Sequence, residues 1–174
     1  MDFASYLAFI GAAILLVMAP GPDSMYVITK SLSSGAHRGI TLSWGLAAGP
    51  LWHTLLVMVG VAAFIKSSLA AFHLLTWGGA LYLLYLSYGA FRSGGASLSI
   101  GEDKGREKSF ALCRRGFLMN ASNPKVLLFF LALLPQFISL SAPLSPEMQI
   151  TIMGLTFSFF TGAIFPSMPW AQVK

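Results

Sequence analysis

Long apolar runs separated by short polar turns dominate this chain. A helix needs about 20 mostly apolar residues to cross the hydrocarbon layer of a membrane, so each run predicts one span. The predicted spans are 3–33 with a break at 20–22, 39–65, 69–91, 117–140 with a break at 123–124, and 148–165. Residues 92–116 form the one long polar segment. The pattern predicts an all-α fold, a polytopic membrane helix bundle in which residues 1–174 make a single membrane domain.

Composition agrees with this pattern and excludes several classes of protein. The chain is 56% hydrophobic and only 10% charged, whereas a soluble domain carries roughly a quarter charged residues. The sequence has no basic patch interleaved with aromatic residues, so we predict no nucleic-acid partner. Cys113 is the only cysteine, which argues against a disulfide framework and a thiolate metal site. The first apolar run lacks a basic start and a small-residue cleavage site, so we expect a retained span and not a signal peptide.

Lysine and arginine residues gather in alternate turns between the predicted spans. The first and third turns hold Lys30, Arg38, Arg92, Lys104, Arg106, Lys108, Arg114 and Arg115. The second turn holds Lys66 alone, and the fourth turn holds none. Loops rich in these residues stay in the cytoplasm, so the asymmetry predicts cytoplasmic first and third loops and an N-terminus outside. The mixed charges around Glu107 predict a solvated connection within the third loop.

The first span is interrupted by Pro20-Gly21-Pro22, and Asp23 follows at once. Proline has no backbone N–H and cannot continue a regular helix. In hydrocarbon, the carbonyl groups that it frees need a partner inside the protein or in a water-filled cavity. Asp23 lies about 30 Å along the span, near the cytoplasmic side. Two interpretations of this acid stay open: a charge that favours the start of the resumed helix, and a functional group in a cavity.

The second interrupted span carries a basic residue at its break. Counting 1.5 Å per residue from Arg115 puts Lys125 about 15 Å deep, near the middle of a ~30 Å hydrocarbon layer. A lysine there costs roughly 3 kcal/mol unless it is paired or hydrated; the alternative is that its ammonium reaches back to the interface. Asn123 is typical of a helix N-cap, and Pro124 suits the first helical turn. Asn120 lies about one turn before the break.

Small, basic and aromatic residues mark further features of the second and third spans. Gly45 and Gly49 have the GxxxG spacing that lets helix backbones approach closely in a membrane, and we expect them to serve helix packing. His53, midway along the second span, is either a proton relay or a histidine hydrogen-bonded within the bundle. A stripe of tyrosines at helical spacing in the third span is typical of a core or of an interface belt. It consists of Tyr82, Tyr85 and Tyr88.

The ordered series of these motifs resembles a known family. The series is Pro20-Gly21-Pro22-Asp23, Lys30-Ser31-Leu32, Gly35-x-x-Arg38-Gly39, Gly45, Gly49, Asn123-Pro124-Lys125 and Leu133-Leu134-Pro135-Gln136-Phe137. In order and spacing it is similar to the LysE/RhtB family of bacterial amino-acid exporters. The resemblance implies a multi-pass protein of the cytoplasmic (inner) membrane that exports homoserine, threonine, lysine or a related amino acid or metabolite. It also implies coupling to the proton gradient, and the sequence has no Walker-type phosphate loop.

Paired interrupted spans are the best sequence pointer to a transporter site. We therefore expect the two breaks to face each other across a cavity, with Asp23 and Lys125 close together. An amino acid is a zwitterion, so Lys125 and the N-termini of the resumed helices would meet its carboxylate. Asp23 would meet its ammonium or carry the coupling proton. The predicted substrate-binding or coupling residues are Pro20, Gly21, Pro22, Asp23, Asn120, Asn123, Pro124 and Lys125. We predict no enzyme activity, no cofactor and no metal site.

The resemblance also implies six spans, arranged as two inverted repeats of three helices. This chain offers five, and its tail from Pro166 to Lys174 is not a membrane helix. We therefore expect an incomplete second repeat, which favours the pairing of copies in a homo-oligomer. The alternative functions are a truncated membrane protein that does not transport, a metal transporter, and a membrane redox protein. The last needs paired cysteines, which this sequence lacks.

Overall fold

A computed structural model of the chain describes residues 1–67, 69–92 and 107–168, and these residues form helices and no strand. The predicted all-α fold is confirmed. Residues 93–106 of the predicted third loop, with Lys104 and Arg106, and the tail 169–174 lie outside the described residues. In chain order the elements are α1 (Phe3–Met18), α2 (Pro22–Ser34), α3 (Ala36–Ser67), α4 (Leu69–Arg92), α5 (Ser109–Ala121), α6 (Pro124–Leu128), a π-helical turn (Phe129–Leu133), a 3-10 turn (Leu134–Phe137), α7 (Pro146–Ile164) and a last 3-10 turn (Phe165–Ser167).

Two kinds of membrane-length segment occur among the described residues. Ala36–Val59 in α3 and Pro146–Ser167 around α7 are each long and apolar enough to cross a membrane alone. Two further segments reach that length only as bent pairs of helices. One pair is α1 with α2, bent by 49°, and the other is α5 with the helical residues from Pro124 to Phe137, bent by 47°. α4 has 24 residues, which rise about 36 Å along the helix axis. By length and apolar character the described residues hold two spans, or four if each bent pair is one span, and the assignment of five spans stays a prediction.

α5 begins earlier than the hydropathy pattern indicates. Its first residue is Ser109, inside the segment 92–116 that was predicted to be a loop. The apolar pattern stops at Arg114-Arg115, but the backbone helix runs through both arginines without a break. Long arginine side chains allow this because they reach polar partners beyond the apolar layer. The last part of the predicted loop is therefore the charged end of a helix.

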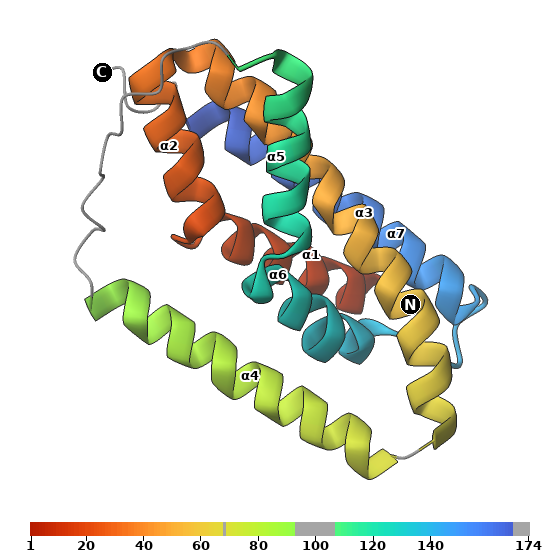
Figure 1. Ribbon diagram of the computed structural model, residues 1–174. Helices are drawn as coiled ribbons and strands as arrows, with labels where there is room; N and C mark the ends of the chain where they lie inside the picture. Colours follow the sequence, from red (N-terminus) through yellow and green to blue (C-terminus); the bar gives the residue numbers. More distant parts are fainter. Residues whose placement is uncertain (68, 93–106, 169–174) are drawn as a thin grey trace.

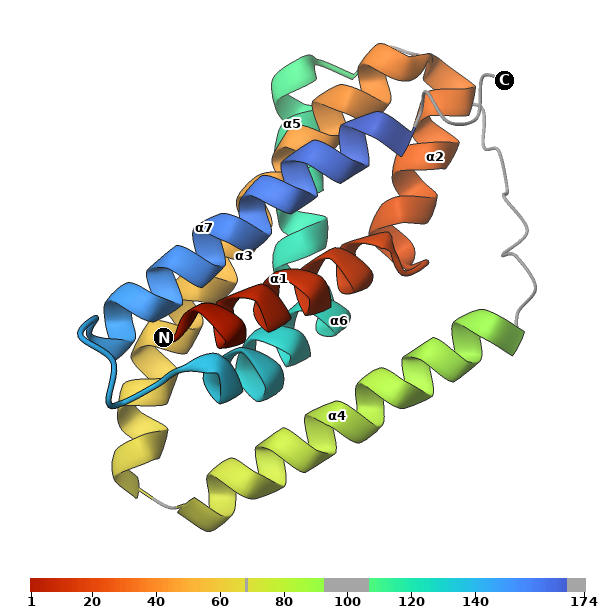
Figure 2. The same ribbon diagram turned by 180° about the vertical axis from the view of Figure 1, so that it is seen from behind.

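α3 lies at the centre of the bundle and packs along α5 and α7 (Figure 1). α3 and α5 cross closely: a Cβ on Gly45 would overlap the Cys113 carbonyl, and a Cβ on Gly116 would overlap the Leu42 carbonyl. Both overlaps are with backbone, which cannot move aside as a flexible side chain can. α1 lies beside α7 (Figure 2). α4 runs along one edge of the bundle, in contact with α3, α6 and the π-helical turn.

An aromatic cluster fixes the helical residues after the second break. Phe129 and Phe130 pack against Phe9 of α1 and Phe157 of α7, with neighbouring ring centroids 5.2 to 6.1 Å apart. All these rings are buried. Lipid tails are as apolar as the rings themselves, so close packing rather than escape from water holds such helices together in a membrane. The cluster thereby gives the second break a rigid support.

Candidate functional site

The first break is short and well capped. α1 ends at Met18, and α2 begins at Pro22, where the missing N–H would have had no helical partner in any case. The Ser24 hydroxyl accepts from the N–H of Gly21 and donates to the Gly21 carbonyl, each at 3.0 Å. Asp23 consequently lies in the first turn of α2 with only 4% of its surface exposed. The acid faces the protein interior.

The second break has a similar arrangement made by different residues. α5 ends at Ala121, and α6 begins at Pro124. The Asn123 side-chain oxygen accepts from the backbone N–H of Lys125 at 3.0 Å, so Asn123 is the N-cap that the sequence predicted. Lys125 lies in the first turn of α6 as a result. Both breaks therefore carry an ionisable side chain directly after a helix N-terminus.

The two breaks meet through Lys125. Its ammonium donates to the carbonyl oxygen of Ala19, the residue that follows α1, at 2.8 Å. The helix interruption leaves that carbonyl without a regular helical partner, and the lysine supplies one that hydrocarbon cannot. The lysine side chain packs directly against the first break, since a Cβ on Gly21 would lie in van der Waals contact with Nζ, at 3.4 Å. The expectation that the two breaks face each other is confirmed.

Asn120 connects Asp23 to His53. Its side-chain amide donates to Oδ2 of Asp23 at 2.8 Å, and its backbone carbonyl oxygen lies 3.0 Å from Nε2 of His53. All three residues are buried. One more polar atom on each has no hydrogen-bond partner among the described residues: Oδ1 of Asp23, Oδ1 of Asn120 and Nδ1 of His53. Buried polar atoms are rarely left unpartnered, so these atoms mark a place for a proton, a water molecule or a ligand.

Gly49 determines the position of Asn120. A Cβ on Gly49 would overlap the Asn120 side chain, so α3 and α5 approach each other here as closely as a glycine allows. The Asn120 amide is thereby held against α3 and directed toward Asp23 on α2. The glycine that we expected to serve helix packing also shapes this polar chain.

Two cavities lie beside these residues. The smaller has a volume of about 20 Å³, which is room for about one water molecule; Asp23, Asn120, Asn123 and Lys125 contribute to its lining. The larger has a volume of about 420 Å³ and opens between the two breaks and α4. Its lining residues are Pro20, Gly21, Pro22, Tyr85, Gly89, Asn123, Pro124 and Lys125. Each residue that we predicted to bind or couple substrate lines one cavity or the other.

Asp23 and Lys125 line the smaller cavity together, but no ion pair joins them in the described part of the chain. The acid is bonded to Asn120, and the base is bonded to Ala19. An isolated charge at membrane depth is costly. Two opposite charges held apart across a small cavity therefore suit a ligand that brings one charge of each sign.

Comparison with known proteins gives a relationship that agrees with the motifs. The family model of the LysE type translocator matches residues 14–166. The chain belongs to the LysE-type translocator family. It is 34% identical to a homoserine/homoserine lactone efflux protein of Salmonella typhimurium over 161 residues. These residues cover 90% of this chain and 74% of that protein. Over 152 residues it is 27% identical to a leucine efflux protein of Klebsiella pneumoniae, across 87% of this chain and 71% of that protein.

Another relative of this chain is an uncharacterized membrane protein of Vibrio cholerae. The two are 33% identical over 156 residues, which make up 90% of this chain and 75% of the relative. No solved structure matches the chain. Family membership and the apolar helices together indicate that the chain is a bacterial membrane protein.

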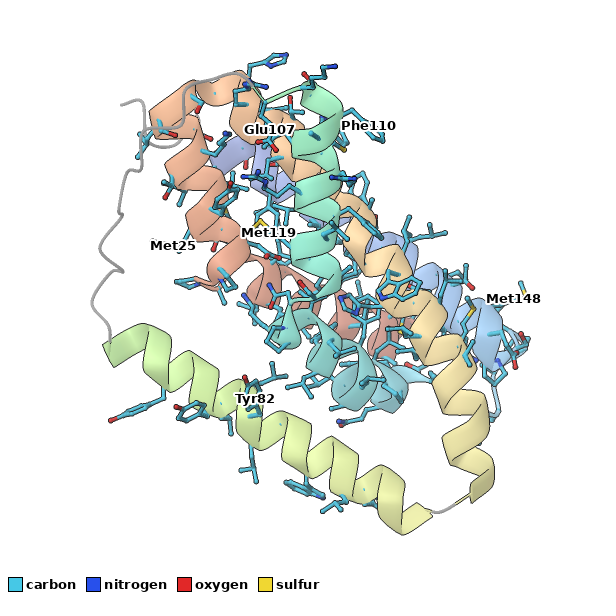
Figure 3. The ribbon with its side chains drawn as sticks, viewed as in Figure 1. Met25, Tyr82, Glu107, Phe110, Met119 and Met148 are labelled. Carbon is cyan, nitrogen blue, oxygen red and sulfur yellow. The ribbon has the colours of Figure 1, made fainter. Side chains whose placement is uncertain are left out.

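α4 contributes to the larger cavity two residues that sequence reasoning did not select, Tyr85 and Gly89. The tyrosine stripe was a signal, but its spacing alone is equally typical of a core or an interface belt. In the structure Tyr85 is among the residues that line the larger cavity, although 69% of its surface is exposed. Tyr82 lies on the same helix, with its ring centroid 6.2 Å from that of Tyr85 (Figure 3).

A charged cluster lies at the end of the bundle where α2, α3 and α5 converge (Figure 3). The Glu107 carboxylate lies 3.0 Å from Nη2 of Arg115 and 3.8 Å from Nζ of Lys30. Arg38 donates to the Glu107 carbonyl, and Arg115 donates to the Tyr26 hydroxyl at 2.8 Å. The sequence predicted only a solvated connection around Glu107. In the structure these residues tie α2 to α5 about two helical turns beyond the first break.

Proposed function

We propose that this protein exports an amino acid across the bacterial cytoplasmic membrane in exchange for protons, with the two helix breaks as its substrate site. The observation that carries the proposal is the hydrogen bond from Lys125 to Ala19, which joins the breaks at a place lined by an acid and a base. Family membership supports transport, and two relatives are named as efflux proteins for homoserine or its lactone and for leucine.

The substrate replaces bonds that the protein makes to itself when the site is empty. The Lys125 ammonium leaves the Ala19 carbonyl and binds the substrate carboxylate, assisted by the N-termini of α2 and α6. The Ala19 carbonyl and the Asp23 carboxylate then accept hydrogen bonds from the substrate ammonium. Each charge of the zwitterion gains a partner, and the protein loses only one internal hydrogen bond.

Asp23 gives a simple route to proton coupling. Its carboxylate holds either the substrate ammonium or a proton, because both compete for the same oxygen atoms. Oδ1 of Asp23 has no hydrogen-bond partner among the described residues and offers the place for either. In one half of the cycle Asp23 carries the substrate outward, and in the other half it returns with a proton. The cycle therefore exchanges substrate for protons. Alternating access follows from rocking of the bent pairs about their breaks.

The charge asymmetry supports an orientation for this exporter. With the N-terminus outside and the first and third loops in the cytoplasm, the Glu107 cluster lies on the cytoplasmic side. Asp23 then lies between that cluster and the centre of the membrane. The substrate would enter from the cytoplasm along the seam between α2 and α5.

The test is amino-acid efflux from proteoliposomes that contain the purified full chain. We expect Asp23→Asn and Lys125→Gln each to lower efflux at least about tenfold, which corresponds to loss of one charged hydrogen bond of roughly 1.5–3 kcal/mol. Glu147→Gln is the matched control, because Glu147 is an exposed acid in the first turn of α7. Efflux that survives both site variants, or that ignores an imposed pH gradient, would contradict the proposal.

A further inference from the structure

The larger cavity has an unusual lining for a site beside two charged breaks. Lys125 is the one charged side chain among the described residues that line it, and no carboxylate is among them. Asn123 and Tyr85 supply polar groups, and proline and glycine supply the rest. A volume of about 420 Å³ lies within the range of small-molecule sites. The cavity therefore has space for a ligand but offers only one charge to it.

We propose that this cavity holds the side chain of the exported amino acid and selects an uncharged one, with Tyr85 and Gly89 of α4 as specificity-determining residues. The inference rests on the proposed function, in which Lys125 binds the substrate carboxylate and Asp23 receives its ammonium. Lys125 lines both cavities. The smaller cavity has room for about one water molecule, so a substrate whose carboxylate is bound by Lys125 places its side chain in the larger one.

Charge excludes the basic and acidic amino acids. A lysine or arginine side chain in the cavity would meet the Lys125 ammonium and no carboxylate among the described lining residues. An aspartate or glutamate side chain would need a second cation, because Lys125 already holds the α-carboxylate. An unpaired charge at membrane depth costs enough to lower efflux by about 100-fold. Neutral aliphatic and hydroxylated side chains carry no such penalty, and the Tyr85 hydroxyl can bond to the latter.

Gly89 controls the volume available to the side chain. Tyr85 and Gly89 lie four residues apart, so they share one face of α4, the face toward the breaks. A Cβ on Gly89 would meet no atom within 4 Å. A larger residue there therefore fills cavity space without overlapping the protein. Gly78 of the same helix has equally open surroundings but does not line the cavity, which makes it the matched control position.

The experiment is counterflow with proteoliposomes that contain the full chain, using alanine, homoserine, leucine, phenylalanine, lysine, arginine and glutamate. We expect efflux of the neutral amino acids and about 100-fold slower efflux of the charged ones. Gly89→Leu should slow leucine and phenylalanine about tenfold while alanine stays near the wild-type rate. Tyr85→Phe should slow homoserine relative to leucine. Gly78→Leu should change none of these rates.

The outcomes separate this inference from the proposed function. If lysine or glutamate is exported as fast as leucine, and Lys125→Gln abolishes that export, the proposed function stands and the selectivity inference is wrong. If Gly89→Leu slows every substrate equally while its thermal unfolding matches that of Gly78→Leu, the cavity does not hold the side chain. Gly89→Val, a smaller change, should give an intermediate size preference if the inference is right. If no amino acid is exported by the wild-type chain, both ideas fail.

Discussion

The Lys125 ammonium donates a hydrogen bond to the carbonyl oxygen of Ala19, 2.8 Å away, although the two residues belong to different interrupted helices. Each break thereby supplies what the other lacks. The first break has a carbonyl that lost its helical partner, and the second has a cation with no acid in ion-pair contact among the described residues. The Lys125 ammonium forms no ion pair with an acid among the described residues, so a substrate carboxylate can replace the Ala19 carbonyl as its partner.

Lys125→Met should abolish efflux while leaving the protein about as stable as before. The change leaves the Ala19 carbonyl unpartnered, which costs about 1–3 kcal/mol. It also removes a desolvated cation, which relieves roughly 3 kcal/mol. The two terms offset each other, so the midpoint of thermal unfolding in detergent should stay near the wild-type value or rise. A large fall in that midpoint would mean that Lys125 serves the fold and not the substrate.

Gly49→Ala should lower efflux even though Gly49 lines neither cavity. The added methyl group overlaps the Asn120 side chain and pushes its amide away from Asp23. Overpacking of this kind costs typically 1–3 kcal/mol. The measurement is efflux together with thermal unfolding. Gly11→Ala in α1 is the control, because a Cβ on Gly11 meets nothing within 4 Å; equal effects of the two changes would rule out the proposed contact.

The helix breaks could be predicted because their cause is local. Proline removes a backbone donor wherever it stands, so Pro22 and Pro124 both mark the start of a helix, and the Asn123 cap follows from the same short-range chemistry. The depth of Lys125 in the membrane, counted at a fixed rise per residue, stays a prediction. These features needed no knowledge of the partner helix. The presence of two interrupted spans predicted that the breaks meet. The hydrogen bond from Lys125 to Ala19 shows where they do.

The role of α4 and the start of α5 could not be predicted in the same way. A helix with lipid on one side and protein on the other is apolar on all its faces. Its hydrophobic residues therefore lack the strong helical period that marks the inward face of a helix in a soluble protein. Tyr85 therefore carried no sign of which way it faces. The α5 start was misplaced because hydropathy reports burial in lipid, whereas a helix is defined by its backbone hydrogen bonds. Ser109 begins a helix whose charged end stands outside the apolar run.

Glu107→Gln should loosen the connection between α2 and α5. The change removes the carboxylate that pairs with Arg115 and Lys30. Because the Arg115 side chain is 50% exposed, loss of its pair with Glu107 should lower the unfolding free energy by about 1 kcal/mol or less. Loss of the pair with Lys30, whose side chain is 2% exposed, adds to this. The effect should be largest at low ionic strength and shrink as salt is added. Glu147→Gln, at an exposed acid in α7, should show no such salt dependence of thermal unfolding. If both variants depend on salt to the same extent, the ion pairs of Glu107 do not stabilise the contact between α2 and α5.

His53→Gln should retain both the fold and proton-coupled efflux, whereas His53→Leu should lose stability. Nε2 of His53 meets the Asn120 carbonyl near the end of α5. Leucine would remove this bond and leave the buried carbonyl to the backbone N–H of Asn123, at a cost of about 0.5–1.5 kcal/mol. Glutamine carries an N–H group that can take over the bond, but it cannot exchange a proton near neutral pH. Thermal unfolding and efflux driven by a pH gradient measure the two effects. If His53→Gln folds normally yet no longer responds to the gradient, His53 is a proton relay and its bond to Asn120 is part of the proton path.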